Sequence, residues 1–334
     1  MSVKPAIKTL WLLILAALLI GLGLTGLGVA LGGSMPTGFG PGTRGMRFYD
    51  WRAGTYYDSR MRPVYQVQDG TSAYPHVKTV REDVHSLSVS LVSTGVMLIP
   101  TSDSELSYSI RTEDLSQYRI EVTDGTLEIE FEANPTFFGL GNILTVSDSD
   151  QIIINIPRDM VLQKVEVRNV SGFTNIAGNR QYGQPDHGEI LQADHLELTT
   201  VSGDIWIDEN VQASRLDLTT VSGEINAGGI GLDTPQGTAL NLEIVSGSAF
   251  ITAANLSSLN VDMVSGHARL AIHDLDDFDI EVSNISGTVS KDGQVISSGI
   301  GSGRAGHGRG GKSIEVSVIS GDISLDLAPQ EDGR

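Results

Sequence analysis

Cysteine is absent from this 334-residue chain, aromatic residues make up only 6% of it, and basic residues are scarce. Without cysteine there can be no disulfide, thiol nucleophile, zinc–thiolate site or lipid-modified cysteine anchor. Few aromatic residues and 39 glycines favour many short strands and turns over long helices. The 22 Lys and Arg face 41 Asp and Glu, a net charge of −19. This balance argues against a nucleic-acid partner, because phosphates are bound by clustered basic side chains.

Residues 9–33 contain no charged side chain and open with a strongly apolar run. A helix of that length, rising about 1.5 Å per residue, is long enough to span the roughly 30 Å hydrocarbon core of a bilayer. The alternative is a cleaved signal peptide with a cut after Gly32, but the apolar region of a signal peptide is usually shorter. Lys4 and Lys8 precede the run and favour a cytoplasmic N-terminus, which places the body of the chain outside the cytoplasm.

The predicted organisation has five segments. They are a short cytoplasmic N-terminus (1–8), a transmembrane anchor (9–33), a linker and capping segment (34–79), a β-strand-repeat domain (80–327) and a disordered tail (328–334). From residue 61 onward, 16 basic residues face 39 acidic ones, so the outer domain should avoid anionic lipid.

A Ser-Gly pair preceded by Val or Ile recurs seven times, at intervals of 31, 20, 24, 19, 21 and 34 residues. The pairs are Ser171-Gly172, Ser202-Gly203, Ser222-Gly223, Ser246-Gly247, Ser265-Gly266, Ser286-Gly287 and Ser320-Gly321. Relative to each serine, apolar residues recur at −6, −4, −1, +3 and +5, and a degenerate earlier copy surrounds residues 93–95. We expect these apolar side chains, including the one at −1, to line a continuous core. The third full unit shows the pattern with Leu216, Leu218, Val221, Ile225 and Ala227.

Alternation with period two on each side of Ser-Gly predicts two strands per unit, each with one buried face. The glycine permits a corner that a β-carbon would obstruct. A unit of about 20 residues cannot close a core alone, so successive units must stack. We therefore expect an all-β fold, a β-solenoid or β-helix-like stack of Val-Ser-Gly repeats behind an N-terminal transmembrane helix. Stacked antiparallel hairpins are the alternative. The threonines at 199, 200, 219 and 220 are expected to point outward.

Before the regular repeats, residues 118–131 predict a hairpin around Thr123-Asp124-Gly125, and residues 152–156 predict a further strand. These strands, the Val-Ser-Gly corners and the single anchor together carry a resemblance. The chain resembles the bacterial putative-adhesin family of membrane-anchored β-strand-repeat domains, over roughly residues 80–327. The resemblance implies an extracytoplasmic β-helix-like domain, in a family largely of unknown function. It implies no catalytic residues.

The sequence from Gly306 to Ser313 matches the phosphate-binding pattern G-x-x-x-x-G-K-S. That motif works between a strand and a helix whose N-terminus holds the phosphates, but here a repeat strand follows. We therefore predict no nucleotide site. Arg304, Arg309 and Lys312 form a basic cluster on an acidic body, and this loop is a candidate contact for an anionic envelope polymer. A solvated insertion is the simpler interpretation.

Other groups with chemical potential are interpreted as structural. The acidic stretch 273–279 lacks calcium-loop spacing and its glycine, and predicts a solvated corner. The pairs Asp186-His187 and Asp194-His195 have no third ligand at a metal-like spacing. The repeated serines lack an activating base. The sequence thus predicts no catalytic residue, no metal and no cofactor.

The leading hypothesis is a non-enzymatic, membrane-anchored surface protein that presents the solenoid to an envelope protein, a glycan or another copy of itself. A carbohydrate-active β-helix enzyme is an alternative, which would need carboxylates that converge on one face. Asp204, Glu224 and Asp322 share the +2 position, but they recur as a ladder and do not form one site. A sensor or regulatory partner in envelope-stress signalling is the third hypothesis.

The topology prediction can be tested with reporter fusions. Alkaline phosphatase joined after Arg334 should be active, because the enzyme needs an oxidising compartment to fold. A reporter that works only in the cytoplasm should be silent at the same position. The reverse pattern would contradict both the localisation and the surface role.

Overall fold

The computed structural model describes residues 48–50, 55–57, 63–66, 75–92, 94–112, 115–131, 151–176, 190–207, 211–231, 234, 236–305 and 312–328. The chain divides into two compact units, Met1–Ala73 and Tyr74–Arg334. The first contains a three-stranded antiparallel sheet of β1 (Phe48–Asp50), β2 (Thr55–Tyr57) and β3 (Pro63–Gln66). These strands lie within the predicted linker and capping segment.

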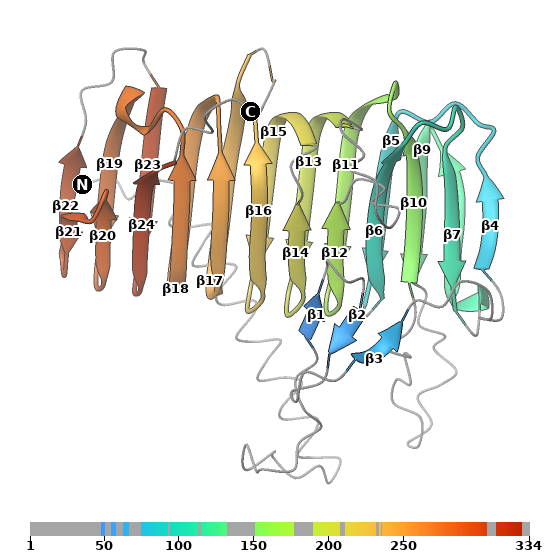
Figure 1. Ribbon diagram of the computed structural model, residues 1–334, viewed down its shortest axis with the longest axis horizontal. Helices are drawn as coiled ribbons and strands as arrows, with labels where there is room; N and C mark the ends of the chain where they lie inside the picture. Colours follow the sequence, from blue (N-terminus) through green and yellow to red (C-terminus); the bar gives the residue numbers. More distant parts are fainter. Residues whose placement is uncertain are drawn as a thin grey trace, which may run out of the picture. The chain divides into compact units, whose positions relative to one another are not determined.

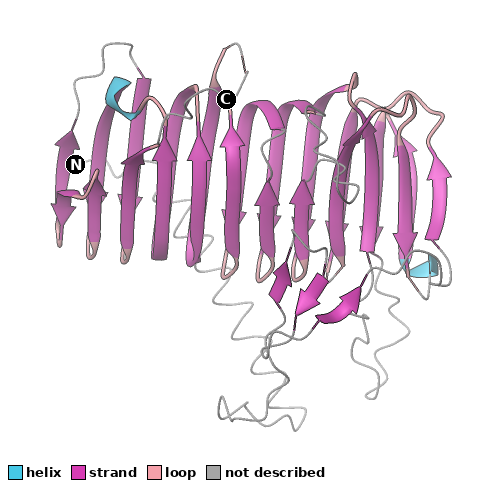
Figure 2. Cartoon of the chain, viewed as in Figure 1, coloured by secondary structure: helices cyan, strands magenta, loops and turns pink. Residues whose placement is uncertain are grey.

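The second unit holds 21 strands, β4 to β24, and its described residues include two short 3-10 turns, η1 (Leu115–Gln117) and η3 (Leu275–Asp277) (Figure 2). Its described residues confirm the all-β class. Residues 9–33, for which an anchor is predicted, lie outside the described residues. Among the described residues, no helix has the length and apolarity needed to cross a membrane.

Each repeat consists of two strands joined at a Ser-Gly corner. Strands before the corner form what we call the leading sheet: β5 (Ser86–Leu91), β11 (Val161–Asn169), β13 (Leu191–Thr200), β15 (Val211–Thr220), β19 (Phe278–Asn284) and β23 (Lys312–Val318). Strands after it form the trailing sheet: β6 (Gly95–Thr101), β12 (Phe173–Ile176), β14 (Asp204–Ile207), β16 (Glu224–Ile230), β20 (Thr288–Lys291) and β24 (Asp322–Leu327). Two longer strands run through their corners into both sheets: β17 (Thr238–Ala253) and β18 (Leu256–Ile272).

Equivalent strands of neighbouring coils pair in parallel, which is the geometry of a solenoid and not of stacked hairpins (Figure 1). In the leading sheet one ladder runs through Leu87, Val165, Leu196, Leu216, Leu240, Leu259, Ile314 and Ile280. In the trailing sheet the corresponding ladder runs through Val96, Thr174, Ile205, Ile225, Ala249, Ala268, Ile323 and Val289. All of these side chains are buried, so the core is a column of like residues between the two sheets.

Coil order departs from chain order at both ends of the stack. Near the C-terminus, β23 and β24 insert between β18 and the pair β19 and β20. Near the N-terminus, β5 and β6 lie between the coil of β11 and β12 and the outer strands β9 (Thr126–Phe131) and β10 (Gln151–Pro157). In both places the chain forms an inner coil and an outer coil out of sequence, as Figure 1 shows by its colours.

Antiparallel strands stand at all four ends of the two sheets. They are β4 (Pro75–Thr79) beyond β7 (Ser107–Arg111), β8 (Tyr118–Thr123), β21 (Gln294–Ser298) and β22 (Gly301–Ala305). The predicted hairpin is confirmed as β8 and β9, whose turn has Asp124 at φ 49° and Gly125 at φ 72°. Positive φ at both central residues is typical of the turn that joins two tightly paired strands.

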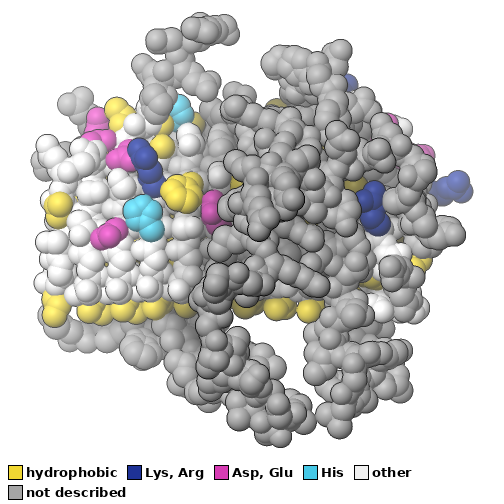
Figure 3. All heavy atoms as spheres, turned by 60° about the horizontal axis from the view of Figure 1, so that its bottom comes forward, with side chains coloured by type: hydrophobic (Ala, Val, Ile, Leu, Met, Phe, Trp, Pro, Cys, Tyr) yellow, Lys and Arg dark blue, Asp and Glu magenta, His cyan; other side chains and the backbone are white. Residues whose placement is uncertain are grey.

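The burial of the residue before each serine differs from the prediction. Val170, Val201 and Ile285 are 45%, 41% and 56% exposed, so position −1 faces outward and not into the core. Strand alternation explains this, because positions −6 and −4 already face the core and an unbroken strand brings −2 inward next. The −1 residues form a row along the corner edge, which we call the valine ridge, and Figure 3 shows a hydrophobic row of this kind.

Thr200 and Thr220, predicted to point outward, are buried at position −2. Each hydroxyl accepts a 2.8 Å hydrogen bond from the backbone N–H of the corner glycine, Gly203 and Gly223 respectively. A buried hydroxyl is tolerated when it has such a partner. Thr199 and Thr219 lie on the outer face and are half-exposed.

The corner glycines are required by close packing between coils. A β-carbon on Gly223 would lie 1.7 Å from the carbonyl oxygen of Gly203, and one on Gly203 would lie 1.8 Å from that of Gly172. Neither contact could be relieved by a side-chain rotation, because the clashing atoms belong to the backbone. Only glycine therefore lets successive corners stack at strand spacing.

Two truncations test the corrected register. Leu218→Ala should lower the free energy of unfolding by about 2–5 kcal/mol, because Leu218 is fully buried and its loss leaves a cavity. Val221→Ala, three residues later on the valine ridge, should cost less than about 1 kcal/mol. Denaturant unfolding of both variants beside the parent chain gives the comparison. Equal losses would show that the burial of the ridge is wrongly assigned.

Candidate functional surfaces

The corner serines face outward and bond to the neighbouring coil. The Oγ of Ser222 donates to the carbonyl of Val201 at 3.0 Å, and that of Ser202 donates to the carbonyl of Val170 at 3.2 Å. Both hydroxyls therefore hold neighbouring coils together at the corner, which is the structural role that the repeat suggests.

Two of the three residues of the predicted basic loop lie among the described residues, and both face a carboxylate. Lys312 begins β23, and its Nζ lies 2.8 Å from Asp274 Oδ2 and 5.3 Å from the centre of the Phe278 ring. Arg304 lies on β22 with its guanidinium 3.5 Å from Glu281, while Arg309 lies outside the described residues. The lysine of the phosphate-loop pattern thus sits on a strand and already has a carboxylate partner, a context unlike that of a nucleotide site.

Two of the four carboxylates in the acidic stretch around η3 pair with lysines. Asp274 pairs with Lys312, and Asp276 pairs with Lys291 at 2.5 Å. The two carboxylates thus have separate cationic partners. Within the part of the chain that the structure describes, no three His, Asp or Glu side chains are grouped so that they could hold a metal.

Of the two Asp-His pairs in the sequence, the structure describes Asp194-His195. His195 Nε2 lies 2.7 Å from Asp217 Oδ2, on the next coil, and so has a partner other than its neighbour Asp194. Asp186 and His187 lie outside the described residues. The contact follows from the ladder register, in which His195 stands opposite Arg215 and Glu197 opposite Asp217.

The outer face of the leading sheet carries a network of ion pairs across two neighbouring coils, those of β11 and β13. Lys164 Nζ lies 2.6 Å from Glu166 and 2.9 Å from Glu197, and Arg168 contacts both carboxylates. The hydrogen bond to Glu166 is the main reason that the pKa of Lys164 is raised. Burial alone would raise the pKa of Glu197, but its bonds to Lys164 and Arg168 outweigh burial and lower it.

Further along the same face, the acidic side chains differ in whether they have partners that stabilise their charge. Burial would raise the pKa of Asp217, but hydrogen bonds from Arg215, Asn241 and His195 outweigh it and lower that pKa. Glu243 has the opposite environment, since its pKa is raised by burial and then by the nearby charges of Asp262 and Asp217. The leading face therefore runs from a compensated network to an uncompensated acidic region.

The outer face of the trailing sheet is different in chemistry. Its +4 row reads Asn175, Trp206, Asn226, Phe250 and Arg269 on five successive coils. We call Trp206 and Phe250 the aromatic stripe; Phe250 is 40% exposed and Trp206 is half-exposed.

Polar and charged groups flank the stripe on the +2 row. Asp204 Oδ1 accepts a 3.0 Å hydrogen bond from the backbone N–H of Glu224, and the pKa of Glu224 is raised by burial and by the charge of Asp204. The rings of Phe250 and His267 are 6.4 Å apart. The sequence places Asp204 and Glu224 in the +2 row. The aromatic stripe was not predicted, although Trp206 and Phe250 each lie four residues after a corner serine, Ser202 and Ser246 respectively.

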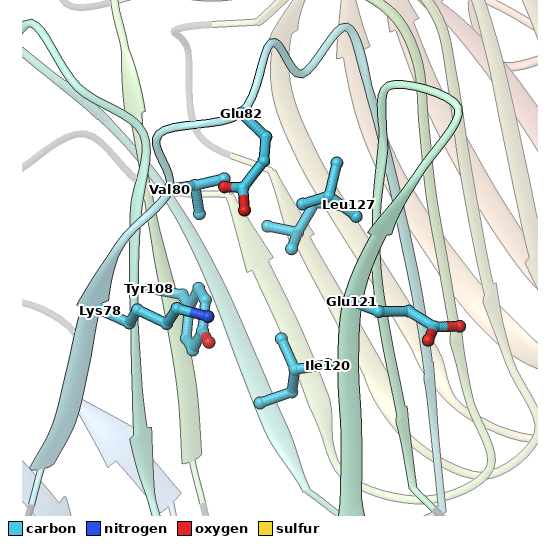
Figure 4. A pocket seen from close by; sticks show the side chains of 8 residues that line it. Lys78, Val80, Glu82, Tyr108, Ile120, Glu121 and Leu127 are labelled. Atoms are coloured by element: carbon cyan, nitrogen blue, oxygen red, sulfur yellow. The ribbon is translucent and has the colours of Figure 1, made fainter.

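A cleft of about 230 Å³ lies at the N-terminal end of the second unit. Its lining comes from β4, β7, β8, β9 and the segment after β4: Lys78, Val80, Glu82, Tyr108, Ile120, Glu121, Val122 and Leu127. Figure 4 shows Lys78 beside Tyr108, while the carboxylate of Glu121 points away from the other labelled side chains. Burial, and then the charge of Glu82, raise the pKa of Tyr108. Half of the lining residues are aliphatic, and the others carry a charge or a phenolic hydroxyl.

Comparison with known proteins agrees with this architecture. The family model described as Toastrack DUF4097 matches residues 84–326, and the chain belongs to this family. No curated protein matches the sequence.

Several solved structures are similar to the chain. A putative adhesin from Bacteroides fragilis is 12% identical, covers 77% of this chain and 98% of its own length, and has a TM-score of 0.40. A putative cell adhesion protein from Clostridium sporogenes is 12% identical over 76% and 99%, with a TM-score of 0.38. A putative lipid binding protein from Parabacteroides distasonis is 17% identical over 75% and 96%, with a TM-score of 0.41.

Two isosteric substitutions on the leading face should have opposite effects. Asp217→Asn should lower stability near neutral pH, by about 1 kcal/mol, because the folded chain stabilises this carboxylate. Glu243→Gln should raise stability there, because folding disfavours the ionised form of Glu243.

The pH dependence supplies the control. The contribution of Asp217 is present above its unfolded pKa and is lost as pH falls through its lower folded pKa. The penalty at Glu243 is present above its raised folded pKa and disappears as pH falls below that range. Urea unfolding of the two variants, at neutral pH and in acid, should show both differences shrink in acid. Effects of the same sign at neutral pH would contradict the assigned environments.

Proposed function

We propose that this protein is a non-enzymatic, membrane-anchored surface protein whose stack lies outside the cytoplasm and presents its outer faces to a protein or glycan partner. The observation that carries the proposal is the unbroken register of the outer ladders. From β12 to β18, each coil places its +4 side chain beside that of the next coil. The result is a flat, extended surface with ordered rows of side chains, which suits binding to an extended partner better than chemistry at one point.

The anchor rests on the uncharged run of residues 9–33, whose length fits a bilayer. Held by such a segment, the stack stays close to the membrane and meets envelope components there. The acidic leading face supports a partner other than anionic lipid, because like charges repel at short range.

The enzymatic alternative is less well supported by the carboxylates of the +2 row. A glycosidase places two carboxylates on either side of one bond. Asp204 bonds instead to the backbone of the next coil, and Asp322 is separated from Glu224 by the coils of β17 and β18. These groups are spread along a ladder, an arrangement that favours binding.

The proposal can be tested by photo-crosslinking in living cells. A photoreactive residue replacing Thr219 would probe the leading face, and one replacing Phe250 would probe the trailing face. At least one of them should give a discrete adduct, detected as a protein band or by a carbohydrate stain. Val295 on the end strand β21 is 60% exposed and serves as the control position. If neither face gives more adduct than Val295, the proposed surface role is wrong.

A further inference from the structure

We propose that the trailing face holds a binding strip for an uncharged linear glycan, with Trp206 and Phe250 as stacking platforms. Asn175 and Asn226 serve as the hydrogen-bonding groups between and beside them. This inference rests on the proposed function and names the class of partner for one face.

The register fixes the spacing of the two rings. Trp206 stands opposite Asn226, and Asn226 stands opposite Phe250, so one strand separates the aromatic residues. Neighbouring strands lie about 4.8 Å apart, which places the two backbone positions about 9.6 Å from each other. A linear glycan advances by about this length over two sugar units, so alternate sugars could meet the two platforms while the sugar between them lies over Asn226.

The chemistry of the strip matches a sugar chain. The C–H face of a pyranose ring is apolar and carries partial positive charge, so it packs against the electron-rich face of an aromatic ring. Each amide of Asn175 and Asn226 offers both donors and an acceptor to the hydroxyl groups at the edge of the sugar. The Oδ1 atom of Asn175 is buried and accepts no hydrogen bond from the described residues. A small movement of its side chain would give this acceptor a hydroxyl partner.

Charge on the flanking row indicates an uncharged glycan. Asp204 and Glu224 border the stripe and can accept hydrogen bonds from sugar hydroxyls, but they repel uronate, phosphate or sulfate groups. The only basic side chain in the +4 row next to the stripe is Arg269, whose Nε lies 3.0 Å from Asp326 Oδ2. On the flanking +2 row the basic side chain is His267, whose ring lies 6.4 Å from that of Phe250, so among these described positions no Lys or Arg is left unpaired for an anionic polymer.

A protein partner fits the strip less well. The core of a protein–protein interface is usually a contiguous apolar patch. In the +4 row Asn226 lies between Trp206 and Phe250, so a polar amide separates the two rings. Alternation of ring and amide suits a ligand that itself alternates between apolar faces and hydroxyl edges.

The experiment is calorimetry with the full chain, purified in a detergent without a sugar headgroup. The probes are the uncharged β-1,4-linked hexasaccharides of glucose, xylose, mannose and N-acetylglucosamine. At least one should bind, with an affinity that changes little between low and high salt, because no ion pair is formed. Trp206→Ala and Phe250→Ala should each weaken that binding about tenfold. Trp206→Phe should restore part of it, and the disaccharide should bind more weakly because it is too short to reach both rings.

Ile285→Ala is the matched control, since it removes an exposed apolar side chain from the valine ridge on another surface. It should leave the affinity unchanged. Unfolding measurements on every variant separate a lost platform from a lost fold.

The inference is overturned if none of the four hexasaccharides binds at millimolar concentration, or if Trp206→Ala and Phe250→Ala bind as well as the parent chain. The crosslinking experiment keeps this failure distinct from failure of the surface role. A protein adduct at Phe250 without glycan binding would refute the glycan strip and leave the surface role standing, whereas no adduct at either face would refute the surface role.

Discussion

Contact between the corner glycines of neighbouring coils sets the spacing on which the rest of the stack depends. The carbonyl oxygen of Gly203 occupies the space that a side chain on Gly223 would need, and the same relation holds between Gly172 and Gly203. Because the corners can approach this closely, both strands of each coil reach hydrogen-bonding distance of the next coil at once. Buried threonines at position −2 bind the glycine N–H groups, which satisfies the backbone where the chain turns. The column of Leu, Ile and Val side chains then packs without a change of register.

The last coil of a parallel stack leaves a strand edge on which a further coil could pair. In this chain, antiparallel strands cover that edge at the ends of both sheets. At the C-terminal end, β22 and β21 pair antiparallel with the outer strands β19 and β20, and β23 and β24 lie further inside. At the N-terminal end, β8 pairs antiparallel with β9, β4 pairs antiparallel with β7, and β5 and β6 lie further inside. An antiparallel edge does not present the parallel pairing pattern that would recruit another coil. The glycine-rich stretch around β22, which from sequence alone reads as a loop, forms part of this ending. The cleft beside Tyr108 lies at the N-terminal end of the stack.

The two outer faces share one ladder geometry but have different chemistry. On the leading face, charged residues of neighbouring coils meet because the register places them opposite each other, and the pairs around Lys164 compensate one another. On the trailing face the same geometry places the amide of Asn226 between Trp206 and Phe250. Solvent-facing positions do not determine the fold, so each face is free to carry its own pattern of residues. This freedom is what lets a repetitive scaffold hold a specific binding surface.

The sequence by itself determined the all-β class, the Ser-Gly corners, the hairpin of β8 and β9 and the inward direction of Leu216, Leu218 and Ile225. Each of these depends on local alternation or turn chemistry, which the order of residues displays directly. Tertiary structure alone decided the rest. Val201 and Val221 are apolar yet face outward, while Thr200 and Thr220 are polar yet lie inside, because the parity of the strand and a hydrogen bond to the corner outweigh side-chain polarity. The insertion of β23 and β24 inside β19 and β20, and the pairing of His195 with Asp217, join residues far apart along the chain. Such contacts follow from which coils become neighbours, and that order is set by the packing of the whole stack.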